Sequence, residues 1–217
     1  MTERVVIIGA GGFGREVLDV IEAINLDQAA LGAARYDVLG FLADPAPDLG
    51  LLSAYGVPYL GSVTDLEGLP EDVGYVIAIG SPDVRRKIDE YGQSLGRSSP
   101  VLVHPSATMG RQVELGPGTV ICSHASLTNH ITLGRHVHVN LNCTVGHDAT
   151  LSDYVTLSPL VAISGNVSAE PGAFFGTGCK VNPGLSVGAM AVVGTGAAVI
   201  RDVAAGTTVV GVPAKVH

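Results

Sequence analysis

Residues 127–151 read LTNHITLGRHVHVNLNCTVGHDATL, and an aliphatic residue stands at every sixth position of this stretch. The same spacing continues in both directions without a slip, from Met109 to Val199, and all sixteen positions of the series are apolar. With 47% hydrophobic residues in the chain, chance would produce such a series on the order of once in 10⁵. The period therefore indicates a repeating structure.

A period of six belongs neither to a lone strand, which repeats every two residues, nor to a helix, which repeats every 3.6. Glycine often follows the aliphatic residue directly, which is typical of a short strand, a turn and a repeat. Three such units make one coil of about 18 residues. The sequence predicts a parallel β-helix over 101–217, with all sixteen aliphatic side chains in its core and the tail VPAKVH covering the open last coil.

A second series lies two residues before the first and is small or aliphatic throughout, except at Thr119. Cys143 and Cys179 belong to it, and we expect them to fill core positions. With Cys122 they make three cysteines without close spacing, which favours reduced thiols in a cytoplasmic protein over a disulfide framework.

The residues before 101 follow the pattern of a parallel α/β unit, in which the strand VVII leads through the glycine turn GAGGFG into an amphipathic helix. We expect a small Rossmann-like domain over 1–100 that ends at GRSSP, residues 96–100. Its strands are predicted at 5–8, 36–44 and 74–81, and its helices at 15–24 and 82–95.

The charge balance excludes several classes of partner. The formal net charge is −8 and there are 12 Lys and Arg residues, so we expect no nucleic-acid or anionic-membrane surface. The first apolar run is four residues long, between Arg4 and Gly9, which is too short for a signal peptide or a membrane span.

Four features together resemble one known family: the hexad repeat, GAGGFGREV at 9–17, GHD at 146–148 and GVPAK at 211–215. They are similar to the PglD/NeuD/VioB-like branch of the left-handed β-helix sugar acetyltransferases, and the similarity covers essentially the whole chain. The resemblance implies a left-handed coil, a homotrimer, acetyl-CoA as co-substrate and a nucleotide-linked sugar as acceptor.

His147 follows the inward Val145 by two residues, at a corner where its side chain can leave the wall. Coils of about 18 residues place Gly165 above it and Asn129 below it, and Gly165 leaves room for a thioester beside its N–H. A histidine, with an ordinary pKa of about 6.5, can act as a general base at neutral pH, and Asp148 would orient it. The resemblance implies the same two roles; the alternative is a solvated turn pair.

The resemblance implies that acetyl-CoA lies along the later coils and the tail. Its predicted contacts, besides Gly165, are Thr156, Thr177, Thr195, Lys180 and Lys215, with Arg201 as a further cation. Each of these cations could instead be an ordinary surface side chain. Thr156 stands where bacillosamine-type members have a second histidine, and His138, one coil earlier, does not replace it.

Gly9, Gly11 and Gly14 have the spacing of a dinucleotide fingerprint, although hydride transfer would need a substrate domain that the repeat does not supply. The resemblance implies nucleotide-sugar binding instead, and the alternative is a tight turn without a ligand. Phe13 stands where bacillosamine-type members have histidine, and Asn140 matches an asparagine near the acceptor. The predicted acceptor contacts are Gly12, Phe13, Gly14, Ala43, Asp44, Gly80 and Asn140.

The histidines at 124, 130 and 136 step by six, so they belong to three different faces and cannot converge on one metal ion. We expect surface or interface roles for these three, with His130 stacked one coil from Asp148, and no metal site. Together with the position of His147, the resemblance implies direct N-acetylation of an amino group on a nucleotide-linked sugar. The alternatives are O-acetylation of a sugar or small alcohol, and non-catalytic nucleotide-sugar binding.

Overall fold

The computed structural model describes residues 2–29 and 35–217. Contacts within the chain divide it into two compact units, Met1–Pro105 and Ser106–His217. Each unit is described by itself below.

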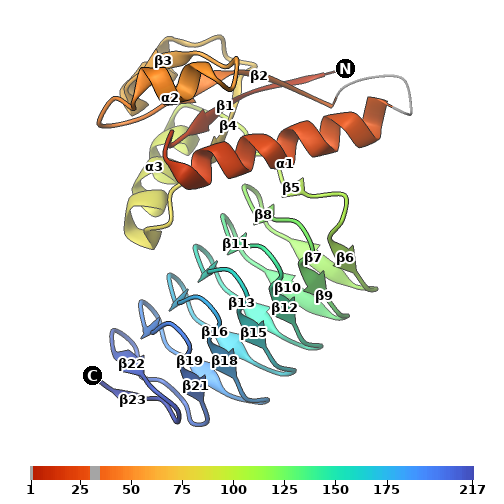
Figure 1. Ribbon diagram of the computed structural model, residues 1–217, viewed down its shortest axis with the longest axis vertical. Helices are drawn as coiled ribbons and strands as arrows, with labels where there is room; N and C mark the ends of the chain where they lie inside the picture. The colour runs from red at the N-terminus through yellow and green to blue at the C-terminus, as the bar shows by residue number, and fades with distance from the viewer. Residues whose placement is uncertain (1, 30–34) are drawn as a thin grey trace. The chain divides into compact units, whose positions relative to one another are not determined.

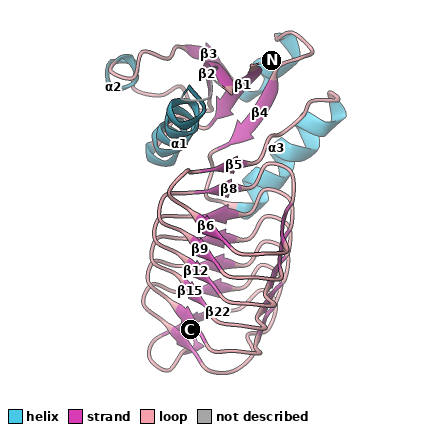
Figure 2. Cartoon of the chain, turned by 90° about the vertical axis from the view of Figure 1, so that its right-hand side faces the viewer, coloured by secondary structure: helices cyan, strands magenta, loops and turns pink. Residues whose placement is uncertain are grey.

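The first unit is built on a four-stranded parallel sheet in the order β3-β2-β1-β4 (Figure 1). Three of its strands are the predicted ones; the short edge strand β3 is an addition, because its three half-buried residues carry no periodic signal. In Figure 2 α1 and α3 lie on opposite sides of the sheet. The elements are β1 (Glu3–Ile8), α1 (Gly12–Ala29), β2 (Tyr36–Leu42), α2 (Leu49–Ser53), β3 (Tyr59–Gly61), η1 (Val63–Gly68), β4 (Gly74–Ile77) and α3 (Pro82–Ser94).

The turn between β1 and α1 is tight because glycine allows the helix to approach the strand end closely. A Cβ at Gly14 would stand 1.9 Å from the carbonyl oxygen of Gly9, so no larger residue fits there. The carboxyl ends of the parallel strands meet at one edge of the sheet, where open α/β folds place their ligands. The residues that follow β1, β2 and β4 therefore converge at that edge.

The second unit is a left-handed parallel β-helix whose strands are two or three residues long. The coils stack regularly, with β6, β9, β12 and β15 in line (Figure 2). Val145 lies in register between Leu127 and Ile163, each one predicted coil away. The hexad period therefore describes the coil correctly.

Three sheets form the walls, and the short strand β5 (Leu102–Val103) precedes them along the chain. The first wall contains β6 (Thr108–Met109), β9 (Ser126–Leu127), β12 (Thr144–Val145), β15 (Ala162–Ile163), β18 (Lys180–Val181) and β21 (Ala198–Val199). The second contains β7 (Val113–Leu115), β10 (Ile131–Leu133), β13 (Thr150–Leu151), β16 (Ser168–Ala169) and β19 (Ser186–Val187). The third contains β8 (Val120–Ile121), β11 (His138–Val139), β14 (Thr156–Leu157), β17 (Phe174–Phe175), β20 (Val192–Val193), β22 (Thr208–Val210) and β23 (Lys215–Val216).

Fourteen of the sixteen predicted inward residues are buried. Met109 is 43% exposed and Leu115 is half-buried, so the prediction that all sixteen form the core was wrong for the first coil. Both residues lie on the terminal strands of their sheets, β6 and β7, where a coil packs on one side only. At the other end the tail folds back, and β23 pairs antiparallel with β22.

The corners of the coils adopt left-handed backbone conformations at every sixth residue. Ten non-glycine residues between Gln112 and Met190 have φ between 48° and 65°, among them His130 and Asp148. Histidine, asparagine and aspartate tolerate this region better than most side chains. Six of the ten are histidine, asparagine or aspartate, and the other four are Gln112, Tyr154, Leu160 and Met190.

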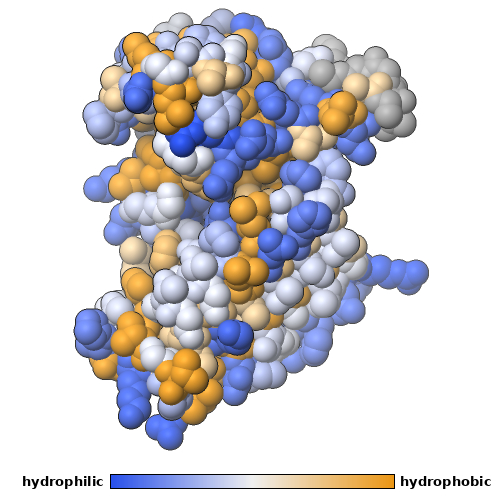
Figure 3. All heavy atoms as spheres, in the orientation of Figure 1, coloured by the Kyte–Doolittle hydropathy of each residue, from blue (hydrophilic) through white to orange (hydrophobic). Residues whose placement is uncertain are grey.

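The surface carries hydrophobic side chains in small groups. On the face drawn in Figure 3, hydrophobic residues are separated by hydrophilic ones. Within the second unit the large exposed hydrophobic side chains include Leu160, Met190, Val212 and Val216. Among the described helices, none has the length and apolar character needed to cross a membrane.

Candidate active site

His147 and Asp148 share the corner that follows β12, and both side chains are exposed. The Nδ1 atom of His147 lies 2.6 Å from Oδ2 of Asp148. Because an ionised carboxylate only accepts hydrogen bonds, Nδ1 must carry a proton, and in the neutral imidazole this leaves a lone pair on Nε2. Hydrogen bonds from His130 and His147 hold the pKa of Asp148 below its usual value, so this carboxylate stays charged at neutral pH.

Gly165 lies directly against the imidazole of His147. A Cβ at this position would stand 2.7 Å from Nε2, so the ring occupies space that any other residue would fill. The stacking follows the predicted column: Asn166 donates its N–H to the carbonyl of His147 at 2.8 Å, and Asp148 donates to the carbonyl of Asn129 at 3.2 Å. In the described part of the chain, the N–H of Gly165 takes part in no hydrogen bond.

The three histidines spaced by six residues have three different surroundings. His124 is exposed, and its backbone N–H donates to Oγ of Ser106 at 3.1 Å. His130 contacts Asp148, with Nδ1 2.5 Å from Oδ1. His136 is fully buried within the chain and stacks on Tyr154 with ring centroids 6.1 Å apart, so the expected surface or interface role was wrong for it.

Thr156 lies on β14 of the third wall, Asn140 directly follows β11 of the same wall, and both are buried. Asn140 donates from Nδ2 to the carbonyl oxygen of Leu157 at 2.7 Å, so its amide NH₂ group binds the backbone of the next coil. Thr156 stands in register with His138 of the preceding coil, and both are at most 3% exposed. The structure therefore places both predicted contacts inside the wall.

The side chains predicted for acetyl-CoA in the later coils are exposed, unlike Thr156. Lys180 stands on β18 directly opposite Ala162, whose strand runs on toward Gly165. Thr177 and Thr195 stack in one column, where Gly196 donates to the carbonyl of Thr177 at 2.9 Å. Lys215 lies on β23, and Arg201 is also exposed.

The first unit contains a cavity of about 840 Å³ at the carboxyl edge of its sheet. Four predicted residues line it: Gly12, Phe13, Ala43 and Asp44. Two others do not. Gly14 packs against the strand end, and Gly80 accepts a hydrogen bond from the Arg85 guanidinium through its carbonyl.

Sequence reasoning missed Arg15 and the loop 45–48 as parts of this cavity. The guanidinium of Arg15 lies over the ring of Tyr55, 5.8 Å from its centroid. Asp44 accepts a hydrogen bond from the backbone N–H of Val63 at 3.0 Å, which uses one of its two carboxylate oxygens. The sequence offered one signal that Arg15 lines the cavity, namely its position directly after the glycine turn.

Within residues 2–29 and 35–217, no group of three or more His, Cys, Asp and Glu side chains is arranged to hold a metal ion. The three cysteines are buried free thiols. Burial raises the pKa of Cys143 to about 11 and that of Cys179 to about 12, so neither is a ready nucleophile.

Comparison with known proteins connects both units to one family. The PglD N-terminal domain family matches residues 4–91. A UDP-N-acetylbacillosamine N-acetyltransferase from Bacillus subtilis is 35% identical over 120 residues, which is 55% of this chain and 51% of that protein. This match thus spans about half the length of the curated relative.

Solved structures match over nearly the whole chain. The acetyltransferase domain of PglB from Neisseria gonorrhoeae is 33% identical, with a TM-score of 0.87 and full coverage of both chains; it has also been solved with acetyl coenzyme A. A variant of perosamine N-acetyltransferase from Caulobacter crescentus, in complex with CoA and GDP-perosamine, is 32% identical, with a TM-score of 0.85, covering 98% of this chain and 96% of that one. The chain therefore belongs to the PglD-like family of left-handed β-helix sugar acetyltransferases.

Proposed function

We propose that this protein transfers the acetyl group of acetyl-CoA directly to an amino group on a nucleotide-linked sugar, with His147 as general base. The observation that carries the proposal is the short contact between Nδ1 of His147 and Asp148, combined with an Nε2 atom that faces the open backbone of Gly165. The substrates named for the two solved relatives, acetyl coenzyme A and GDP-perosamine, support the substrate class.

In this mechanism the acceptor nitrogen attacks the thioester carbonyl carbon while Nε2 of His147 takes a proton from that nitrogen. Asp148 accepts the Nδ1 hydrogen and stabilises the imidazolium that forms. The oxyanion accepts a hydrogen bond from the unused N–H of Gly165. Collapse of the tetrahedral intermediate breaks the carbon–sulfur bond, and the CoA thiolate takes the proton back from His147.

The exposed side chains of the later coils are suited to a phosphorylated coenzyme. Lys180 and Lys215, with Arg201 as a further cation, supply positive charge for the phosphates of CoA. The stacked pair Thr177 and Thr195 offers hydroxyl groups along one column. Thr156 is buried, so we propose it as part of the wall behind the coenzyme.

The cavity of the first unit is suited to the nucleotide sugar. Helix α1 begins at Gly12, and a Cβ at Gly11 or Gly12 would meet nothing within 4 Å, so a phosphate has room at this helix N-terminus. Phe13, Ala43 and Asp44 border the same space. Gly14 and Gly80 stand next to lining residues in the chain, and we keep Asn140 of the second unit as a proposed contact of the acceptor. In this proposal residues 1–100 bind the acceptor, and residues 101–217 perform the transfer as a cytoplasmic homotrimer.

The test is release of free CoA thiol from acetyl-CoA with UDP-, GDP- and dTDP-linked amino sugars, with the parent hydroxy sugars alongside. We expect turnover with one amino sugar, and its loss in His147→Ala but not in His124→Ala, which removes an exposed corner histidine elsewhere. Turnover with hydroxy sugars alone would establish O-acetylation instead. Binding of a nucleotide sugar without any turnover would indicate a non-catalytic protein.

A further inference from the structure

Asp148 is held by two histidines, one from its own coil and one from the coil before. His130 contacts Oδ1 through its Nδ1 at 2.5 Å, while His147 contacts Oδ2 through its Nδ1 at 2.6 Å. The two imidazoles therefore bind different oxygens of one carboxylate. This anchors the carboxyl group against rotation about its bond to Cβ.

The backbone holds His130 in place for this contact. His130 and Asp148 occupy the same corner on successive coils, with φ values of 54° and 59°. His130 donates its N–H to the carbonyl of Arg111 at 3.0 Å, and Asp148 donates to the carbonyl of Asn129 at 3.2 Å. Both corners are thus tied to the wall, and the side chains meet because the coils stack in register.

The chemistry of the three side chains determines where the protons lie. A carboxylate supplies only acceptors, so each imidazole must present Nδ1–H to Asp148. If one oxygen of Asp148 had no donor, the carboxyl group could turn, and His147 could adopt the other tautomer, with its proton on Nε2. That tautomer cannot accept a proton from an acceptor at Nε2.

We propose that His130 is a positioning residue for the reaction: it holds Asp148 in the orientation that keeps the proton of His147 on Nδ1 and leaves Nε2 free. This inference rests on the proposed function, because His130 acts only through Asp148 and touches neither substrate. The charged and titratable side chains at this corner are Arg111 on the preceding coil, His130 itself, and His147 and Asp148 on the following coil.

Two variants at position 130 separate a positioning role from a structural one. His130→Ala removes the donor, whereas His130→Asn places an amide N–H near the position of Nδ1 and tolerates the left-handed backbone. We expect kcat to fall about tenfold in the Ala variant, part of the 10²–10⁴ that a general base provides, with KM for both substrates unchanged. The Asn variant should recover most of this loss.

His124→Ala is the matched control, because His124 is an exposed corner histidine with a φ of 57°. Its loss should leave kcat unchanged. Thermal unfolding of all three variants checks that the fold is intact. A His130→Ala enzyme with the kcat of the wild type would overturn the proposal, as would an Asn variant no better than Ala.

A second measurement does not depend on turnover. In protein labelled with ¹⁵N-histidine, long-range ¹H–¹⁵N spectra report the tautomer of each imidazole, and His147 is assigned by the signal missing in His147→Gln. We expect the Nδ1–H tautomer in the wild type and in His130→Asn, and a mixture in His130→Ala. An unchanged tautomer in His130→Ala would contradict the inference. A changed tautomer in an enzyme that acetylates no sugar would support the coupling of the three side chains and overturn the proposed function alone.

Discussion

The imidazole of His147 lies against the backbone of Gly165 on the next coil, so that a Cβ at position 165 would stand 2.7 Å from Nε2. Carbon and nitrogen atoms that are not bonded do not approach so closely. The orientation of the proposed base therefore depends on the absence of a side chain one coil away.

Gly165→Ala should consequently displace the ring of His147 and lower kcat by about 10²-fold, because a misplacement of about 1 Å is enough for such a loss. CoA release with the preferred acceptor measures it. Gly68→Ala is the control, since a Cβ there would meet nothing within 4 Å and its φ is not in the left-handed region. Full activity of Gly165→Ala would show that the ring does not need this space.

The contact at Gly165 could be predicted from the sequence, because residues that are one coil apart in a strictly periodic chain stack on one another. Counting by coils places Gly165 and Asn129 beside His147, and it places His130 beside Asp148. The same arithmetic does not predict which atoms meet. That both histidines bind one carboxylate follows from side-chain rotamers, which no periodicity specifies.

Other features could not be predicted from the sequence, for physical reasons. The corner position of His136 suggests an exposed ring, yet the ring is buried, because it stacks on Tyr154 and lies against Gly118, which has no side chain. Strand β3 has three residues, too few for an alternating pattern to be visible. The role of Arg15 depends on where the first turn of α1 points relative to the cavity, which is a tertiary property.

Asp148→Asn should reduce kcat more strongly than His130→Ala does, by about 10²-fold or more. An amide offers one acceptor oxygen in place of two, so one histidine must face its NH₂ group. If that histidine is His147, Nδ1 becomes the acceptor and Nε2 carries the proton. Steady-state kinetics with KM for both substrates separate this effect from a loss of binding. Retention of the kcat of the wild type would exclude Asp148 as the partner of the base.

The depressed pKa of Asp148 predicts how stability depends on pH. Hydrogen bonds from His130 and His147 favour the charged form in the folded state, so the folded pKa lies below the unfolded value of about 3.9. The contribution is therefore present above about pH 4 and is lost as pH falls through the folded pKa. Urea unfolding of wild type and Asp148→Asn should show a stability difference at pH 6 that shrinks below pH 4. A difference that stays constant down to pH 3 would contradict the coupling.

The cysteines should resist alkylation in the folded protein. Burial raises the pKa of Cys143 to about 11. The pKa of Cys179 is raised to about 12, mainly by burial and to a smaller extent by the neighbouring Cys143. At pH 8 iodoacetamide should therefore leave the native protein unmodified, while protein in denaturant takes up three equivalents. Because both folded pKa values exceed the unfolded value of about 8.5, stability should decline as pH rises from about 8.5 toward 11. Mass spectrometry after alkylation checks the first point, and alkaline unfolding checks the second.

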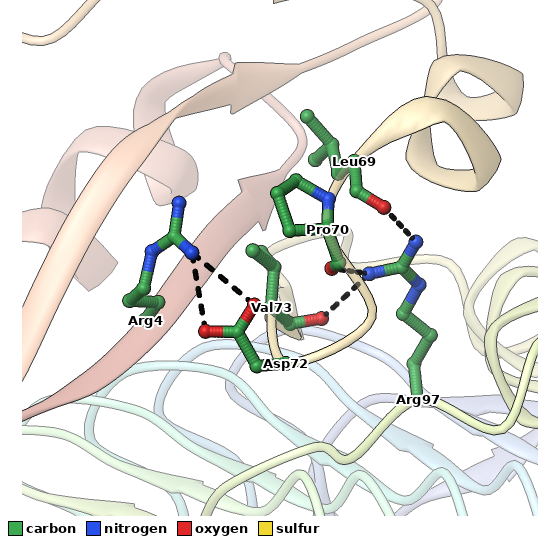
Figure 4. A network of polar contacts seen from close by, with 6 residues as sticks. All are labelled: Arg4, Leu69, Pro70, Asp72, Val73 and Arg97. Carbon is green, nitrogen blue, oxygen red and sulfur yellow. Dashed lines mark hydrogen bonds and ion pairs between the residues drawn. The ribbon is translucent and has the colours of Figure 1, made fainter.

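Two of the arginines in the first unit, Arg4 and Arg97, have contrasting surroundings (Figure 4). Arg97 is 8% exposed, and its guanidinium donates to backbone carbonyls that surround it in the turn before β4, those of Leu66, Leu69, Pro70 and Val73. Arg4 forms an exposed ion pair with Asp72 at 3.1 Å. Buried carbonyls depend on their donors, whereas an exposed ion pair competes with water.

Arg97→Met should therefore destabilise the first unit by about 3 kcal/mol, because several carbonyls lose their partner at once. Arg4→Met, which removes a side chain of similar length, should cost less than about 1 kcal/mol. Hydrogen exchange at the amides of β4 reports this unit within the full chain, and the amides of β12 serve as the internal reference. Equal protection of β4 in the two variants would mean that the turn holds its shape without the guanidinium, and that the carbonyls around Arg97 find other donors.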